Sequence, residues 1–489
     1  MSALKIFNTQ SRKKEVFVPL AEGKVGLYAC GITAYDLCHI GHARSAVVFD
    51  IIARYLRYRG FQVTYVKNFT DVDDKIIDRA RREKTGIAEI AERYIAEHDR
   101  DMDAMGVERP TQTPRATGHI EGMIALVQTL MGKGLAYEMD GDVYFAVDKF
   151  PQYGKLSGRN LEEMMAGARI DVNDRKRNPY DFALWKASKE GEPFWESPWG
   201  RGRPGWHLEC SVMSQRYLGE TFDIHGGGED LVFPHHENEI AQSEGASGKP
   251  LARYWVHNGF VRVNDEKMSK SLGNFFTIRD ILKQYHPEAL RLFLMQSHYR
   301  SPVDFSDAAL AEARQGLNRL YAVLRALGEL SSAGPSGAGT EPLSARDREL
   351  ALQVEALRER FCEAMDDDFN TARAIGYLFE TVRLINAVLA DKKAPAPPAL
   401  LIRGGEIIRE IGGVLGLFRE SADVYLDLDR RREAAKRGLD PVRIEALILE
   451  RRTAREAKAW QRADEIRKEL AGQGVLLQDG QAATTWSIA

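Results

Sequence analysis

The sequence contains one stretch, "GGGEDLVFPHHENE" at residues 226–239, in which three glycines precede two adjacent histidines and several carboxylates. His235 and Glu239 in this stretch offer a ring nitrogen and a carboxylate oxygen, two kinds of atom that bind zinc. Cys30 and Cys210 can add two thiolate sulfurs, which completes a tetrahedral set suited to zinc. Because these residues are scattered along the chain, a whole folded domain would have to hold the site, which excludes a local zinc finger.

The spacing of His235 and Glu239 also predicts local structure. Pro234 suits the first turn of a helix, and residues i and i+4 of a helix lie on the same face. His236 and Glu237 are assigned to the helix cap or to contacts with the metal ligands. Taken alone, however, the stretch fits equally well a glycine-rich turn followed by a solvated helix, so the rest of the chain must decide.

A second group of residues suits phosphate. "CHIGHAR" at residues 38–44 places His39 and His42 three residues apart across Gly41, at the expected start of a helix. A helix N-terminus presents unpaired N–H groups and the positive end of the dipole, and both attract phosphate. Gly41 carries no side chain, so a flat ring can lie against the backbone there. A lone His-x-x-His pair usually has no such role, so this motif needs support from elsewhere.

That support lies far downstream, in "DEKMSKSLGN" at residues 265–274. Lys267 and Lys270 flank a Met-Ser pair, and small and glycine residues around them predict a loop. Two ammonium groups in such a loop can hold a triphosphate and stabilise charge that develops on its α-phosphorus. On its own a Lys-x-x-Lys loop is usually solvated surface.

The elements that must position these residues follow a strand–helix–strand pattern. Residues 24–33 alternate like a strand, residues 42–60 have helical periodicity, and residues 61–75 form a second strand rich in β-branched and aromatic residues. This order predicts a βαβ unit and a parallel sheet. Ligands of such sheets bind at the carboxyl ends of the strands, where Cys30 and Thr70 fall.

The HIGH motif after the first strand and the KMSKS motif late in the chain, both present letter for letter, resemble those of the class I aminoacyl-tRNA synthetases. The resemblance implies ATP with Mg²⁺ as a substrate, an aminoacyl-adenylate, and transfer of the acyl group to tRNA. It assigns ATP binding and catalysis to a set of five residues. These are His39, Gly41, His42, Lys267 and Lys270, of which Gly41 only binds.

The segments "YACGITAYD", "WHLECS" and "GGGEDLVFPHHENE" resemble, more closely, the cysteinyl-tRNA synthetase family, and the resemblance covers essentially the whole chain. It implies that one zinc ion, held by the four ligands named above, binds the thiolate of L-cysteine. It also implies that Thr70 and Trp206 line the amino-acid pocket with His225 close by, and that tRNA(Cys) is the acceptor.

Composition sets the wider limits. The chain has 489 residues, a net charge of −3 and four cysteines, which is too few for a disulfide framework. No leader-like apolar segment or membrane-length apolar run is visible, so we expect a cytoplasmic protein that does not bind membranes. We also expect it to be a monomer. The region from Arg430 to Leu470 has 13 basic against 8 acidic residues. This local excess is a hint of an RNA-facing surface, but composition alone favours a solvated helical face with i,i+4 pairs.

We therefore expect an α/β fold with a Rossmann-type parallel-sheet catalytic domain, an insertion, and α-helical C-terminal domains. The expected parts are the first half of the catalytic domain at 1–110, an insertion at 111–205, the second half at 206–260, a KMSKS and stem-contact region at 261–330, a linker at 331–342, a helical bundle at 343–429 and an anticodon-binding region at 430–489.

Two departures and two alternatives remain. Family members often carry Asp where this chain has Ala459 and Gly where it has Ala483, which weakens inferences about tRNA contacts but not about the active site. One alternative is the mycothiol-pathway cysteine ligase, which shares the nucleotide fold and zinc site but lacks an extended RNA-binding C-terminus. The other is a zinc-dependent nucleic-acid-binding protein without catalysis, against which the two phosphate motifs argue.

Overall fold

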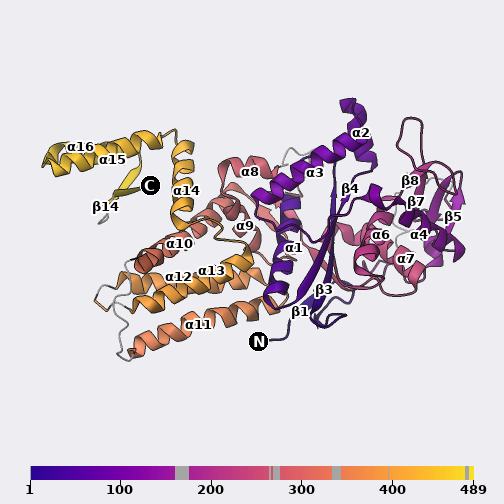
Figure 1. The fold of residues 1–489 in the computed structure, drawn as a ribbon, viewed down its shortest axis with the longest axis horizontal. Helices are drawn as coiled ribbons and strands as arrows, with labels where there is room; N and C mark the ends of the chain where they lie inside the picture. The colour runs from indigo at the N-terminus through magenta and orange to yellow at the C-terminus, as the bar shows by residue number, and fades with distance from the viewer. Residues whose placement is uncertain are drawn as a thin grey trace.

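The computed structural model describes residues 2–159, 176–263, 266–267, 276–332, 343–391, 393–394, 396–479 and 484–488. The molecule is elongated, with a parallel sheet in the middle, an antiparallel sheet at one end and the last helices at the other (Figure 1). Among the helices described, none is both long enough and apolar enough to cross a membrane.

Four parallel strands form the central sheet, in the order β10-β9-β3-β4. They are β3 (Lys24–Thr33), β4 (Gln62–Thr70), β9 (Phe222–Gly228) and β10 (Ala252–Asn258). Side chains of β3 alternate between the two faces, as a pleated strand requires. Leu27 packs with α1 (Ile40–Tyr58) in one core and Tyr28 with α6 (Trp206–Leu218) in another. The predicted parallel βαβ unit is confirmed, with helices on both faces of the sheet.

The chain leaves the sheet in opposite directions from its two middle strands. From β3 it continues through α1 to β4, and from β9 through α7 (Glu237–Ser247) to β10. At such a switch point the two connections diverge, so a crevice opens outside the carboxyl ends of the strands. The segments that follow β3, β9 and β10 surround this crevice.

A smaller antiparallel sheet lies between β4 and β9 in sequence, in the order β5-β6-β7-β8. Its elements are α4 (Ile120–Gly132), β5 (Ala136–Met139), β6 (Asp142–Phe145), β7 (Phe182–Ala187) and β8 (Gly202–Pro204). The ring of Phe145 stacks on that of Phe182 at 5.0 Å, and Trp185 is fully buried beside them. This aromatic core joins the sheet to α4, α6 and α7.

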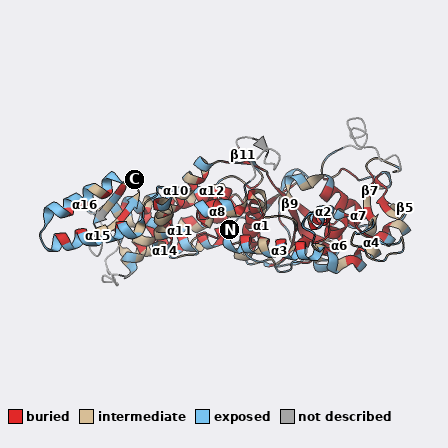
Figure 2. Ribbon diagram, turned by 90° about the horizontal axis from the view of Figure 1, so that it is seen from above, coloured by how far each residue is buried: buried red, intermediate tan, exposed pale blue. Residues whose placement is uncertain are grey.

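Helices dominate the second half of the chain. They are α8 (Ile278–Gln284), α9 (Pro287–Met295), α10 (Asp307–Ser332), α11 (Ala345–Asp366), α12 (Thr371–Ala390), α13 (Pro398–Leu415), α14 (Ala422–Lys436), α15 (Pro441–Glu456) and α16 (Trp460–Gly472). The helices from α9 to α13 share one continuous core with α1. The segment from α14 onward has a small core of its own, and α15 and α16 are largely exposed (Figure 2).

Short elements complete the description. They are β1 (Lys5–Asn8), β2 (Lys13–Val16), α2 (Asp74–Glu83), α3 (Ile87–Ala104), β11 (Val261–Val263), β12 (Glu266–Lys267), β13 (Val303–Phe305), β14 (Val475–Asp479) and β15 (Thr484–Ile488). Helix α10 reaches Ser332, past the expected start of the linker at 331, and residues 333–342 of that linker lie outside the described residues. Ala483 lies outside them as well.

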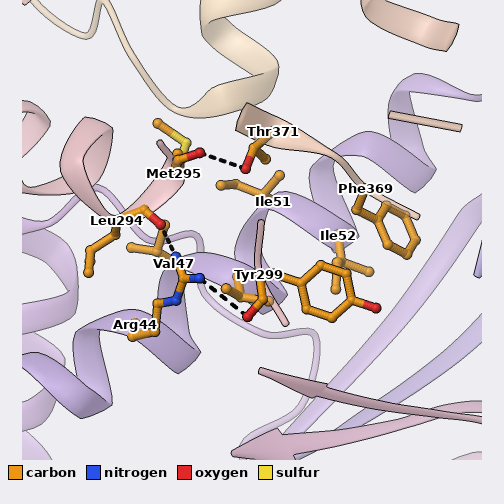
Figure 3. A pocket seen from close by; sticks show the side chains of 10 residues that line it. Arg44, Val47, Ile51, Ile52, Leu294, Met295, Tyr299, Phe369 and Thr371 are labelled. Carbon is orange, nitrogen blue, oxygen red and sulfur yellow. Dashed lines mark hydrogen bonds between the residues drawn. The ribbon is translucent and has the colours of Figure 1, made fainter. Parts of the chain in front are cut away.

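Arg44, in the second turn of α1, connects α1 to the end of α9 and to the segment that follows it. Its side chain is buried, and its guanidinium donates to the carbonyl oxygens of Leu294 and, at 3.2 Å, of Tyr299 (Figure 3). The cavity beside it, which Thr371 also lines, has a volume of about 10 Å³. Because one water needs at least about this much space, the cavity is a packing gap rather than a ligand site.

Replacing Arg44 by Met should destabilise this junction, because several buried carbonyl oxygens lose a charged donor while the side chain keeps its length. We expect the free energy of unfolding of the catalytic half to fall by about 2–4 kcal/mol. Urea unfolding followed by fluorescence measures this. Arg100→Met, at a side chain that is 67% exposed, is the control and should change stability by less than about 0.5 kcal/mol. An unchanged unfolding midpoint for Arg44→Met would show that the contacts contribute nothing.

Candidate active site and metal centre

The structure brings the four predicted metal ligands together. Cys30 lies near the carboxyl end of strand β3, and Cys210 lies in α6. His235 lies just before α7, and Glu239 lies in its first turn. Their ligand atoms all lie within 4.8 Å of one another, and all four residues are buried. Four separate elements therefore converge on one wall of the crevice.

The distances within this cluster fit zinc. Cys30 Sγ lies 3.7 Å from Cys210 Sγ and 3.4 Å from Glu239 Oε1, and His235 Nε2 lies 3.0 Å from the same carboxylate oxygen. A tetrahedron with Zn–S bonds of about 2.3 Å has an S–S edge of about 3.8 Å, and its edges to nitrogen or oxygen are slightly shorter. Two sulfurs, one nitrogen and one oxygen thus stand at the separations that zinc requires.

A second, overlapping set of possible ligands shares two of these residues. It consists of Cys30, His225, His236 and Glu239. Glu239 Oε2 lies 2.8 Å from His225 Nε2, and Cys30 Sγ lies 3.2 Å from His236 Nε2. His236 Nδ1 is hydrogen-bonded to His257, 2.8 Å away. His236 occupies the N-cap position of α7 but makes no side-chain cap hydrogen bond, and its ring is in direct contact with the cluster.

The local structure before α7 differs from the expectation. Pro234 does not open the regular helix: it lies in a π-helical turn, Val232–His236, and α7 begins at Glu237. Phe233 in this turn has an extended backbone. His235 and Glu239 nevertheless face each other, because the turn leads into α7 without a break at His236.

The glycines of the opening stretch allow close packing around the cluster. A Cβ atom on Gly226 would lie 2.1 Å from the ring of Phe49 in α1, and one on Gly227 would lie 2.9 Å from the ring of His236. A side chain at position 226 would displace α1, the helix that carries the HIGH motif. One at position 227 would displace His236, the histidine beside Cys30. The glycines are needed for this reason and not only for a turn.

Burial and mutual contact set the charges in the cluster. Burial opposes the ionisation of Glu239, but His225 and His235 outweigh it and hold the pKa of that carboxyl well below its usual range. A hydrogen bond with Cys30 lowers the pKa of Cys210 to about 6, whereas burial raises the pKa of the Cys30 thiol. Although burial disfavours its charged form, Glu239 and Cys210 raise the pKa of His235 to about 10. A metal ion would therefore displace protons from Cys30 and His235.

A cleft of about 420 Å³ lies against this cluster, and Cys30 lines it. His39 and His42 line the same cleft, with their rings stacked at 3.7 Å. His39 caps α1: the N–H of Gly41 donates to His39 Nδ1 at 3.1 Å, and the N–H of His39 donates to His42 Nδ1 at 3.3 Å. Each neutral ring then carries its proton on Nε2, which is a hydrogen-bond donor suited to phosphate oxygen.

Of the two lysines of the KMSKS motif, the structure describes only the backbone of Lys267. The backbone of Lys267 lies in β12 and pairs with Arg262 of β11. The side chain of Lys267 and the whole of Lys270 lie outside the described residues. Their predicted contact with ATP stays a prediction.

The three residues predicted for the amino-acid pocket lie in different surroundings. Trp206 lines the cleft, is 40% exposed, and stacks on His235 with the ring centroids 4.2 Å apart. His225 is fully buried behind the cluster, on Glu239. Thr70 is buried, donates its hydroxyl to Glu209 at 2.5 Å and is not among the residues that line the cleft, so its place in the amino-acid pocket stays a prediction.

The fold and this site define a class I aminoacyl-tRNA synthetase. The family described as "tRNA synthetases class I (C) catalytic domain" matches residues 16–315. The fold is similar to that of a methionyl-tRNA synthetase from Mycobacterium tuberculosis solved with methionyl-adenylate, with a TM-score of 0.62 at 17% identity, over 86% of this chain and 94% of that one. Residues 360–419 match the family described as "DALR domain" and residues 437–486 the "Cysteinyl-tRNA ligase anticodon binding domain".

The chain belongs to the cysteine–tRNA ligase family. It is 58% identical to a cysteine–tRNA ligase of Geobacter sulfurreducens, over 99% of this chain and all of that one, and 54% identical to one of Syntrophobacter fumaroxidans, over 99% of both. The resemblance inferred from the motifs is thereby confirmed, and with it the class of enzyme, a ligase. Neither alternative is favoured, since a catalytic domain and an anticodon-binding domain are both matched.

Sequence reasoning missed some residues at the site. Asn68 accepts the N–H of Gly31 at 2.9 Å, and its side-chain oxygen lies 3.7 Å from Cys210 Sγ. A Cβ on Gly31 would collide with the backbone oxygen of Asn68, which explains the Cys-Gly pair. Lys67, one residue earlier in β4, lines the cleft. The only available signal was their place at the end of a buried strand.

We predict that Cys210→Ser loses the bound metal ion, because a hydroxyl is a far weaker ligand than a thiolate. Metal content measured by mass spectrometry on protein purified with zinc present checks this. Cys362→Ser is the matched control: this buried thiol lies in α11, far from the cluster in the fold, and the variant should keep one ion per chain. Retention of a full equivalent by Cys210→Ser would exclude this residue as a ligand.

Proposed function

We propose that the chain activates L-cysteine with ATP and Mg²⁺ and transfers the cysteinyl group to the 3′ end of tRNA(Cys), with one zinc ion held by Cys30, Cys210, His235 and Glu239. One observation carries the proposal: Cys30 belongs to the metal cluster and also lines the cleft that His39 and His42 line. A metal ion held there would meet the side chain of an amino acid whose carboxylate faces ATP.

The choice between the two ligand sets rests on the donors. The proposed set contains two thiolates, the ligands that zinc prefers, whereas the other set contains one. His236 already uses Nδ1 on His257, an arrangement that suits a residue orienting its neighbours. We therefore assign His236 and His225 to the support of Cys30 and Glu239.

A zinc ion at the proposed site would let the enzyme select cysteine over serine. The two differ by one atom, and a hydrophobic pocket separates such close analogues by only about 1–3 kcal/mol. When bound, zinc would ligate a thiolate in strong preference to a hydroxyl and lower the pKa of the substrate thiol. Trp206, which lines the cleft and stacks on His235, is assigned to the wall of the pocket around that side chain, and Thr70, hydrogen-bonded to Glu209, is assigned to the same pocket.

The adenylate step needs positioning and charge neutralisation, because the substrate carboxylate is itself the nucleophile. The start of α1 supplies the positive end of the helix dipole and the Nε2–H groups of His39 and His42 for the phosphates, while Gly41 leaves room for the nucleotide. Lys267 and Lys270 are assigned to the charge that develops at the α-phosphorus as pyrophosphate leaves. Each chain carries both the cleft and the cluster, so the proposal requires only a monomer. All four cysteines are free thiols, which suits the cytoplasm.

Cysteine-dependent exchange of pyrophosphate into ATP tests the adenylate step, with serine as the competitor. We expect exchange with cysteine and almost none with serine. X-ray absorption at the zinc edge tests the role of the metal: the number of sulfur ligands should rise from two to three when cysteine is added. Normal exchange by the metal-free enzyme, or a sulfur count that stays at two, would overturn the proposal.

The C-terminal segment offers a surface for tRNA. Trp460 begins α16 inside the region that matches the anticodon-binding domain, and it is 59% exposed. Exposed aromatic rings stack on unpaired bases of RNA loops. Ala459, where family members often carry Asp, precedes this tryptophan as the residue that caps α16 and makes no side-chain cap hydrogen bond.

We predict that Trp460→Ala raises the KM for tRNA about tenfold, because base stacking contributes roughly 1–3 kcal/mol. Pyrophosphate exchange should not change. Leu476→Ala is the control, an equally exposed apolar side chain on β14 of the same segment, and it should charge tRNA normally. Steady-state charging with tRNA transcripts measures both, and equal KM values for wild type and Trp460→Ala would contradict the assignment.

A further inference from the structure

Strand β3 is irregular at the point where it brings Cys30 to the metal cluster. The register of β3 against β4 shifts between Ala29 and Ile32. Two residues of β3, Cys30 and Gly31, therefore lie opposite one residue of β4, Asn68. This arrangement is a β-bulge, which is rare in parallel pairs, and bulges beside functional sites re-aim a side chain.

The bulge changes which face of the sheet the side chains occupy. In a regular strand, residues three apart point to opposite faces. Ala29 and Ile32 nevertheless both pack in the core that contains α1. Cys30, between them, packs in the other core together with Cys210. The bulge thus lets Cys30 face α6 and its cysteine while Ile32 faces α1.

The side chain of Asn68 supports the bulge. The pairing of β3 with β9 ends at Ala29, so the residues beyond it have β4 as their neighbouring strand. The N–H of Gly31 donates to Asn68 Oδ1 at 2.9 Å. Asn68 is 2% exposed, and a backbone N–H that loses its acceptor in a buried place costs free energy comparable to a lost hydrogen bond. The amide of Asn68 therefore fixes the backbone next to Cys30.

The same amide oxygen also contacts the second sulfur of the cluster. Asn68 Oδ1 lies 3.7 Å from Cys210 Sγ, and the two sulfurs lie 3.7 Å from each other. The strands approach closely here, since a Cβ atom on Gly31 would lie 1.5 Å from the backbone oxygen of Asn68. One buried side chain is thus in contact with one sulfur ligand and with the backbone that carries the other.

We propose that Asn68 is a positioning residue for the metal centre: by holding the bulge at Gly31, it fixes Cys30 at the distance from Cys210 that a zinc ion requires. The proposal rests on the function given above, in which these two cysteines bind the metal. Asn68 acts through Cys30 and not on the substrate. Side chains that orient metal ligands typically contribute tenfold to a hundredfold to metal affinity.

Asn68→Ala removes the acceptor and leaves the N–H of Gly31 unpaired. We expect its zinc affinity, measured by competition with a chromogenic chelator, to fall by about tenfold to a hundredfold. In the cobalt-substituted enzyme, the near-ultraviolet absorption from thiolate to cobalt should weaken, because Cys30 no longer keeps its position. Cysteine and ATP are absent from both measurements, so neither depends on catalysis.

Two further variants make the test specific. Asn68→Asp keeps an oxygen that can accept the N–H of Gly31, so it should bind zinc more tightly than Asn68→Ala. Asn318→Ala is the control: it removes a hydrogen-bonded amide of α10, outside the cluster and the cleft, and should bind zinc as wild type does.

Wild-type zinc affinity and an unchanged cobalt spectrum in Asn68→Ala would overturn the proposal. Equal affinities of Asn68→Ala and Asn68→Asp would overturn it as well, because the acceptor would then have no part in the effect. Loss of the far-ultraviolet circular dichroism of the zinc-free protein in Asn68→Ala would assign the residue to folding instead. Absence of zinc from the wild type would refute the proposed metal site itself, and it is measured before any variant is made.

Discussion

The parallel pairing of β3 with β9 is the constraint on which the site depends. Tyr28 lies opposite His225, and the connections that follow the two strands then run in opposite directions from this switch point. Because the strands run in the same direction, their carboxyl ends lie at one edge of the sheet: Cys30 stands near the end of β3, and the glycines at the end of β9 lead into the turn beside it. The same divergence sends one chain into the HIGH helix and the other into the turn that carries His235. The predicted metal ligands and the predicted phosphate ligands are neighbours for this reason.

The cluster combines full burial with ionised side chains, so each charge in it needs a partner. Glu239 is fully buried and is kept ionised by two histidines, one on each carboxylate oxygen. Buried charge is costly unless it is paired, so the cluster has to be assembled as a unit. If zinc is held there as proposed, two thiolates and one carboxylate would give the site a net charge of −1, and a substrate thiolate would make it −2. Glu239 would then be the ligand best suited to loosen, since a carboxylate suits zinc less well than thiolate.

The helical half of the chain is joined to the catalytic half through two aspartates at the end of α11, Asp366 and Asp368. Asp368 accepts the backbone N–H of Phe7, the hydroxyl of Tyr299 and the guanidinium of Arg300. Asp366 accepts the hydroxyl of Tyr55 in α1 at 2.7 Å. These side chains thus hold the N-terminal hairpin, the HIGH helix and the loop that carries Arg300.

The sequence by itself determined the parallel βαβ unit, the family and the four residues that converge in the cluster, because strand periodicity and letter-for-letter motifs are local signals. It did not determine the turn at Pro234, the contact of His236 with Cys30, the hydrogen bond that holds Thr70 on Glu209, or the cleft of about 640 Å³ beside the substrate cleft. Residues 12, 159 and 300 show no common pattern along the chain, and only the packing of the N-terminal hairpin, the insertion and the loop after α9 brings them to this cleft. Such contacts depend on side chains distant in sequence, and periodicity carries no information about those distances.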